Sequence, residues 1–211
     1  MRYTFVKSKP SRSFPEDDAF FCAQSEPDTA EIVIFSGARF KPDHAKAAIL
    51  IELLNECLGE HIDDQESTSI NVLGFARYRN GHDKPSNLVE LVRHANTSEK
   101  AVAAAREMFA AAGFEVVVCS DQAGRIIDRL VIPKYNAALR FLDEGLASQA
   151  DMDLTCKLGL GYPDGPIERV VRGGLANHYH ASKALFEAYG TSAFAPPRRA
   201  SVAYRRDKTR G

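Results

Sequence analysis

Cysteine and histidine are the first residues to consider for chemistry, because both bind metals and cysteine is also a nucleophile. Four cysteines are scattered along the chain without C-x-x-C spacing: Cys22, Cys57, Cys119 and Cys156. His178 and His180 have one residue between them, and two such positions lie about 200° apart around a helix. The spacing predicts no metal site and no redox dithiol. We expect four plain thiols and two ordinary helix histidines.

A glycine-containing turn is a second kind of candidate, because its backbone N–H groups can hold a phosphate. The glycines before residue 100 are too far apart for a G-x-G-x-x-G motif: Gly37, Gly59, Gly74 and Gly81. Ser36-Gly37-Ala38 follows an apolar run and is the candidate phosphate turn. A single glycine is weak support, so the residues alone assign no cofactor site.

Basic residues gather in the tail, 196–211, where the only acid is Asp207: Arg198, Arg199, Arg205, Arg206, Lys208 and Arg210. Such a cluster can hold phosphate groups. The alternative is a solvated and partly disordered C-terminus. We favour this alternative because terminal basic clusters are common.

Composition excludes several classes of protein. With 211 residues, 45% hydrophobic and 26% charged, the chain has an ordinary globular composition, which argues against disorder, collagen and coiled coil. Its most apolar stretch, 45–54, is interrupted by Lys46 and Glu52, so no membrane span is predicted. A net charge of -1 gives no general attraction to nucleic acid. The first ten residues lack the apolar run of a signal peptide, and we expect a cytoplasmic protein.

The elements that must position any site follow from the apolar pattern of the first half. Strands are predicted where apolar and β-branched residues cluster: 19–24, 30–37, 70–75, 87–92 and 115–121. The run 30–37 is apolar throughout, which is typical of a central parallel strand. The rest of the first thirty residues is predicted to be irregular.

Two helices and a turn complete the predicted first half. A helix is predicted for 45–62, opened by Pro42-Asp43-His44, and a polar turn for 63–68. A second helix starts at 96–99, with Thr97 or Ser98 as N-cap, and ends at Gly113. The order β-α-β-β-α-β favours an α/β layer.

The second half lacks strand patterns and is predicted to be helical. The helical stretches are 124–145, 148–159 and 165–190. Pro133 requires a kink or a packing role, and Ser148 with Asp151 is a modest capping signature. We place the domains at 1–121 and 122–211.

The helical half resembles a known family. Its signature is Lys157-Leu158-Gly159-Leu160-Gly161-Tyr162-Pro163-Asp164-Gly165-Pro166, within a segment that runs from Ile126 to Leu175. This stretch resembles the C-terminal helical domain of the 3-hydroxyacyl-CoA dehydrogenases, NAD-dependent enzymes of β-oxidation and butanoyl metabolism. The resemblance covers 124–189, and a weaker similarity reaches back to Val72. It implies a shortened, Rossmann-like α/β domain followed by an all-α dimerisation domain.

The resemblance also implies a reaction and its residues. In the family a histidine takes the hydroxyl proton of a hydroxyacyl thioester while NAD accepts the hydride, and a glutamate orients that histidine. The glutamate position is Glu90, and the histidine position is Ala76, so the proton acceptor is missing. His82, in the loop between the two strands, is the alternative base, although we expect an exposed loop histidine.

A second family position has also changed. The family has an asparagine near the substrate and nicotinamide, and Asp128 stands there, before Arg129. We expect a paired Asp128, with Arg129 or Arg125 as the partner. The catalytic candidates are therefore Glu90 and Asp128, with no metal ligands.

The N-terminus differs most from the family. NAD is the implied cofactor, but the G-x-G-x-x-G motif that would hold it is absent. Much of the first mononucleotide half is missing as well, so the N-terminal segment or another subunit must cover a sheet edge.

The partners expected follow from the family. A homodimer is expected through an apolar face of the helical domain: Ile132, Tyr135, Ala138, Leu139 and Leu142. From these differences we expect a catalytically impaired relative that binds an acyl-CoA. The alternatives are an ordinary dehydrogenase with an unidentified base and a non-enzymatic dimeric scaffold.

Overall fold

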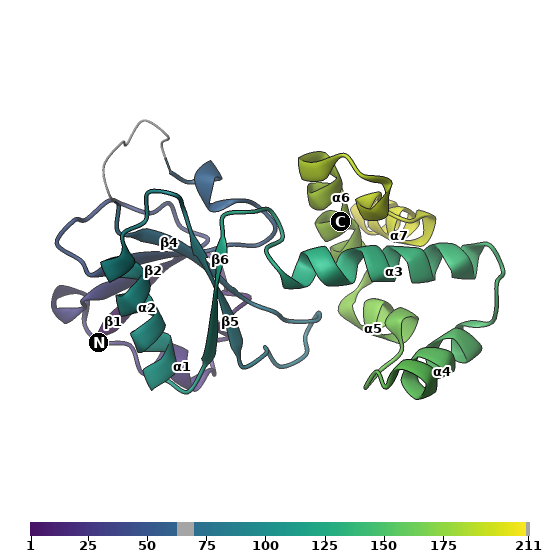
Figure 1. Ribbon diagram of the computed structural model, residues 1–211, viewed down its shortest axis with the longest axis horizontal. Coiled ribbons are helices and arrows are strands. Elements are labelled where there is room, and N and C mark those ends of the chain that lie inside the picture. Colours follow the sequence, from purple (N-terminus) through teal and green to yellow (C-terminus); the bar gives the residue numbers. More distant parts are fainter. Residues whose placement is uncertain (63–69, 210–211) are drawn as a thin grey trace. The chain divides into compact units, whose positions relative to one another are not determined.

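The computed structural model describes residues 1–62 and 70–209. The polar turn predicted for 63–68 lies outside the described residues. The chain divides into two compact units, Met1–Arg79 with Pro85–Arg125, and Asn80–Lys84 with Ile126–Gly211. Figure 1 shows strands and helices in the first unit and only helices in the second.

A mostly parallel sheet forms the first unit. Its strands lie in sequence order: β1 (Tyr3–Lys7), β2 (Ile32–Ser36), β3 (Ala48–Glu52), β4 (Val72–Arg77), β5 (Leu88–Arg93) and β6 (Glu115–Ser120). Neighbouring strands are parallel except for β4 and β5, which form an antiparallel pair. The predicted strands at 30–37, 70–75, 87–92 and 115–121 are confirmed within a few residues at each end.

The two faces of the sheet have different cover. Helices α1 (Ala19–Cys22) and α2 (Glu99–Ala111) contribute Phe20 and Phe109 to a cluster over one face. Ser98 caps α2 by accepting the backbone N–H of Ala101, which confirms that predicted N-cap. The other face packs against loops and the short η2 helix (Leu58–Glu60). It therefore has no long helix over it among the described residues.

Three predictions in the first half are wrong. The segment 45–62 contains strand β3 where a helix is predicted. All five residues of Ala48–Glu52 are buried, because the sheet is covered on both faces at this strand. The sequence pattern of an apolar segment with no polar side is the same for a buried strand and for a buried helix, so it does not distinguish them. The strand predicted at 19–24 is α1, which begins after the N-cap Asp18. Strand β1 lies in the segment predicted to be irregular.

The outer edge of β1 is covered by the N-terminal segment itself. The Phe5 N–H donates to Gln24 Oε1 at 3.1 Å. The N–H and Oγ of Ser25 donate to the Tyr3 carbonyl at 2.8 and 2.9 Å. These bonds use backbone groups of an edge strand that would otherwise be open to pairing with another chain. The sequence predicts that the N-terminal segment or another subunit covers the sheet edge. In the structure the N-terminal segment covers it.

The second unit is a helical bundle. Its helices are α3 (Ile127–Asp143), α4 (Gln149–Leu160), α5 (Pro166–Gly173), α6 (Leu175–Tyr189) and α7 (Arg198–Lys208). Two short helices, η1 (Pro27–Thr29) in the first unit and η3 (Ser192–Phe194) in the second, complete the secondary structure of the described residues. The helical stretch predicted for 165–190 is two helices, because α5 ends at Gly173 and α6 begins after Gly174.

The prediction of a partly disordered tail is wrong, because most of it is helix α7. Ala200 is fully buried, and the Tyr204 ring stacks on Tyr179 with 4.3 Å between centroids. The Arg199 guanidinium pairs with the Asp143 carboxylate at 2.6 Å. Packing against α6 and α3 orders a segment whose charge pattern alone suggested solvation.

The apolar face predicted for dimerisation is turned inward. Ile132, Tyr135, Ala138 and Leu139 are each at most 7% exposed and belong to the core of the second unit. They therefore do not form a free surface within this unit.

Candidate functional site

Glu90 and Ala76 lie directly opposite each other in the antiparallel pair of β5 and β4. Opposed residues of such a pair place their side chains on the same face of the sheet, within reach of each other. Both residues are buried, Glu90 at 2% exposure. Consequently the cross-strand neighbour of the Glu90 carboxylate is a methyl group, with no group that can take a proton.

A second side chain faces Glu90 from the turn after β6. Arg125 has a φ of 49°, a left-handed conformation that is uncommon outside glycine. Its Nε lies 3.5 Å from Glu90 Oε2, and both side chains are at most 4% exposed. Its Nη2 donates to the Leu54 carbonyl at 2.5 Å. The sequence did not point to Arg125 as a partner of Glu90, because the two residues are far apart along the chain.

The chemistry available at this pair is limited. A guanidinium stays protonated at every pH that proteins tolerate, so it cannot accept a proton. Nearby Cys119 is a poor nucleophile, since burial, helped by the negative charge of Glu90, raises the pKa of its thiol to about 11. All four cysteines are free. No cluster of three potential metal ligands occurs in the described residues.

The remaining candidates lie in the second unit. Asp128 is buried in the first turn of α3. The Arg129 guanidinium lies over the Tyr189 ring, 4.6 Å from its centroid. His82 is exposed and lies in the segment Asn80–Lys84, whereas Glu90 belongs to the first unit.

The predicted phosphate turn is occupied by a carboxylate of the protein itself. Glu52, at the end of β3, is 8% exposed. Its Oε1 accepts the Ser11 hydroxyl at 2.9 Å and the Ser13 N–H at 2.6 Å, and its Oε2 accepts the Ser36 hydroxyl. The donors of Ser11, Ser13 and Ser36, which border the loops after β1 and β2, are therefore all hydrogen-bonded to this carboxylate.

This arrangement does not fit the pyrophosphate of a dinucleotide. A pyrophosphate binds at a glycine-rich turn after the first strand, where backbone N–H groups are free to donate. Here a buried carboxylate lies beside these loops, accepts the Ser13 N–H and the Ser11 and Ser36 hydroxyls, and would repel a second anion. Sequence reasoning missed Glu52 because it placed the residue inside a helix.

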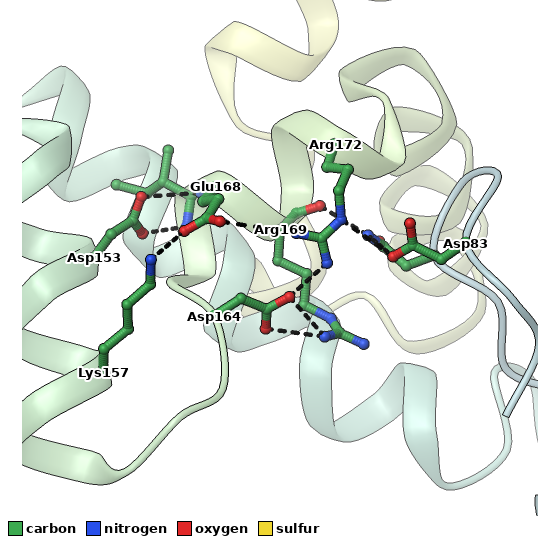
Figure 2. Close-up of polar contacts among 9 residues, drawn as sticks. Asp83, Asp153, Lys157, Asp164, Glu168, Arg169 and Arg172 are labelled. Carbon is green, nitrogen blue, oxygen red and sulfur yellow. Dashed lines mark hydrogen bonds and ion pairs between the residues drawn. The ribbon is translucent and has the colours of Figure 1, made fainter.

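The signature stretch forms the corner between α4 and α5, which Figure 2 shows in detail. The Asp153 carboxylate accepts the N–H groups of Ile167 and Glu168 at 2.9 and 3.0 Å. A Cβ on Gly165 would lie 2.2 Å from Asp153, so only glycine fits there. Gly161 ends α4 with a φ of 68°. These residues position helices and leave no group free for chemistry among the contacts described.

An ion-pair cluster continues from this corner to the loop 80–84. Asp164 pairs with Arg169 at 3.0 Å and with Arg172 at 2.5 Å. Arg172 also reaches Asp83 at 3.1 Å. As Figure 2 shows, the cluster ties that loop to α5.

Comparison with known proteins assigns the second unit. Residues 124–209 match the family model described as 3-hydroxyacyl-CoA dehydrogenase, C-terminal domain. This part of the chain is therefore similar to the C-terminal domain of the 3-hydroxyacyl-CoA dehydrogenases. The resemblance recognised in the sequence is thereby confirmed.

Curated relatives agree with this assignment over part of the chain. A 3-hydroxybutyryl-CoA dehydrogenase of Mycobacterium tuberculosis is 36% identical over 112 residues, which are 52% of this chain and 39% of that protein. Human mitochondrial hydroxyacyl-coenzyme A dehydrogenase is 40% identical over 81 residues, 38% of this chain and 26% of that protein. The chain thus matches well under half the length of these relatives.

Solved structures confirm the fold of the chain. Mycobacterium tuberculosis FadB2 matches with a TM-score of 0.73 at 22% identity, covering 84% of this chain and 66% of that one. The (S)-3-hydroxybutyryl-CoA dehydrogenase PaaH1 of Ralstonia eutropha also gives 0.73, at 19% identity, covering 87% and 69%. The predicted Rossmann-like α/β domain followed by an all-α domain is therefore confirmed. Among the described residues, no helix has the length and apolarity to cross a membrane.

Proposed function

We propose that this relative of the 3-hydroxyacyl-CoA dehydrogenases binds an acyl-CoA thioester without oxidising it. The observation that carries the proposal is the ion pair between Arg125 and Glu90, formed where Ala76 stands in place of a base. In the family's reaction a glutamate orients a histidine; here it faces a guanidinium.

The rate losses expected from a missing base and a missing cofactor favour complete loss of the reaction over a slower reaction. Removing a general base costs about 10² to 10⁴ in rate. Removing the cofactor costs hydride transfer altogether, because the cofactor performs that chemistry. The internal hydrogen bonds of Glu52 argue against a dinucleotide at the loops after β1 and β2. NAD, which the family uses, is therefore not part of the proposed function.

Thioester binding is supported by the retained helical domain. The family model matches this domain from 124 to 209, and the relatives that share it are named for acyl-CoA substrates. The chain length of the acyl group is left open by these matches.

The test is a pair of measurements on the full chain. Calorimetry with acetoacetyl-CoA should show saturable binding, while NADH fluorescence should show none. The double variant Ala76→His with Arg125→Phe removes the guanidinium and offers Glu90 a histidine. Because the dinucleotide site is missing as well, this variant should bind acetoacetyl-CoA as the unchanged chain does and should gain no NADH-dependent reduction of it.

Two results would contradict the proposal. NAD-dependent oxidation of 3-hydroxybutyryl-CoA by the unchanged protein would restore an ordinary dehydrogenase. Absence of acetoacetyl-CoA binding would leave the scaffold alternative. Arg125→Lys, which keeps the positive charge, is the matched control for folding.

We also propose a homodimer formed by the second unit, the arrangement that the scaffold alternative requires. Several large apolar side chains of this unit are at least half exposed: Leu130, Leu146, Leu154, Leu158 and Leu160. Leu154 and Leu158 are one turn apart on α4 and share a face. Exposed apolar patches of this kind mark association sites.

Sedimentation should reveal the dimer and its interface. We expect a dimer for the unchanged chain and a monomer for Leu154→Glu with Leu158→Glu, because buried charges oppose association. The control places two glutamates at exposed alanines on α2, Ala103 and Ala110. A monomeric unchanged protein would contradict this proposal without affecting the thioester experiment.

A further inference from the structure

A cavity of about 660 Å³ lies in the first unit and is independent of Glu90 and of the proposed thioester binding. It lies on the sheet face without a long helix, bordered by the loops after β1, β2 and β3. Its volume falls within the range of small-molecule sites.

The cavity has a clear origin in the chain connection from β2 to β3. Parallel strands are usually joined through a helix that packs on the sheet. Here residues 37–47 make the connection without a helix. Ile51 and Val72, on adjacent strands β3 and β4, therefore line the cavity. Phe40 and Ile62 add apolar wall from the loops.

The acids that line the cavity are engaged by the protein. Glu52 accepts the three hydrogen bonds described above. Glu56 accepts the N–H groups of Leu54 and Asn55 at 3.1 and 2.9 Å. Glu60 accepts the Cys57 N–H at 3.0 Å. Each of the three carboxylates in the cavity lining thus accepts hydrogen bonds from the protein itself.

The cations that line the cavity are not held in this way. Within residues 1–62 and 70–209, Lys9 and Arg39 form no ion pair. Arg12 donates to the Arg79 carbonyl at 2.9 Å, a neutral acceptor. Among the described residues, Lys9, Arg12 and Arg39 therefore have no carboxylate partner, although three carboxylates share the lining. Each of these carboxylates already accepts hydrogen bonds from the protein, so an anionic group of a ligand would pair with the three cations.

We propose that this cavity binds a small amphipathic anion, with its apolar body against Ile51, Val72 and Phe40 and its anionic head toward Lys9, Arg12 and Arg39. A dinucleotide does not fit this description, because the Glu52 carboxylate lies beside the loops after β1 and β2 and would repel a pyrophosphate. The head is a carboxylate or a phosphate monoester, and the body is an alkyl or aryl group.

The test uses the absence of tryptophan from the sequence. Phe40→Trp places the only tryptophan of the variant in the cavity wall, where its emission can be excited apart from that of the tyrosines. Octanoate and octyl phosphate, which carry the two heads, should each change its emission saturably, and the tighter of them identifies the preferred head. Octylammonium should bind about tenfold more weakly, because its charge meets the same cations. Calorimetry of octanoate or octyl phosphate with the unchanged protein checks that the tryptophan does not create the site.

Charge variants localise the head. In the Phe40→Trp background, Lys9→Ala with Arg39→Ala should weaken binding of both anions about fivefold or more. Lys100→Ala with Arg106→Ala removes two exposed cations from α2, on the opposite sheet face, and should leave binding unchanged. Equal binding of octylammonium and the anions, no saturable change with either anion, or an equal effect of both double variants would overturn the proposal.

Discussion

The two units of the chain differ in what their polar residues do for the fold. In the helical unit the family's signature residues are present, and the structure uses them at helix ends: Asp153 accepts N–H groups at the start of α5, and Gly161 ends α4. In the sheet unit the family's glutamate position is kept as Glu90, but the histidine position opposite it is Ala76. Glu90 faces Arg125, and Glu52 takes the donors near the candidate phosphate turn.

This difference explains why the helical unit shows the similarity to the family, whereas the sheet unit argues against the family's reaction. Capping and close-approach positions tolerate few residue types, because the backbone geometry requires a carboxylate or a glycine. Catalytic positions require a specific side chain only while the reaction is performed. A chain that keeps the first set and changes the second keeps the fold of its relatives, whatever it does with a ligand.

The largest expected effect tests whether Glu52 is a structural residue of the sheet unit. Glu52→Ala leaves the donors of Ser11, Ser13 and Ser36 buried without their acceptor, which should cost about 3 to 5 kcal/mol of stability. Hydrogen exchange of the β2 and β3 amides measures the loss. Glu52→Gln keeps an acceptor oxygen and should cost less; equal losses in the two variants would contradict the proposed role of the carboxylate.

A pH-dependent effect tests the buried polar group of the helical unit. His178 Nε2 lies 2.7 Å from Asn136 Oδ1, and burial lowers the pKa of His178 from 6.5 to about 4. A depressed histidine pKa means that the unfolded chain binds the proton first. Stability is then complete above about pH 6.5 and falls toward pH 4, by about 3 kcal/mol.

Urea unfolding followed by tyrosine fluorescence at pH 7 and pH 4 measures this loss, since most tyrosines lie in the second unit. His178→Gln should remove most of the pH dependence. His180→Gln, at an exposed position on the same helix, should retain it. The same pH dependence in both variants would show that another group is responsible.

The smallest expected effects compare two caps of the helical unit. Asp153→Ala removes the acceptor of two N–H groups at the start of α5 and should cost about 2 kcal/mol. Ser148→Ala removes the acceptor of one N–H group, that of Asp151 at the start of α4, and an exposed hydroxyl bond to the Asp151 carboxylate. It should cost about 1 kcal/mol. Urea unfolding of both variants checks the order. A larger loss for Ser148→Ala would show that the signature aspartate does not hold this corner.

Much of the fold was predictable because it depends on local patterns. Apolar runs with turn residues at their ends gave the strands at 30–37 and 115–121, and Ser98 was recognised as an N-cap before α2. The signature at 157–166 identified the helical domain. Within the candidate site, Glu90 and Ala76 could be named only through the family's pattern.

Other features were decided by tertiary structure. Ala48–Glu52 is a strand because both its faces are covered, and α7 is ordered because Ala200 and Tyr204 pack in the second unit. Such burial depends on neighbours that are distant along the chain.

The sequence by itself determined the helical unit and its similarity to the 3-hydroxyacyl-CoA dehydrogenases, since capping and glycine positions are set by backbone geometry within a few residues. Only the tertiary structure decided that Arg125 faces Glu90, that Glu52 accepts from Ser11, Ser13 and Ser36, and that a cavity lies beside β3. Each of these depends on which strands are neighbours, and strand order arises from long-range packing that no local pattern contains.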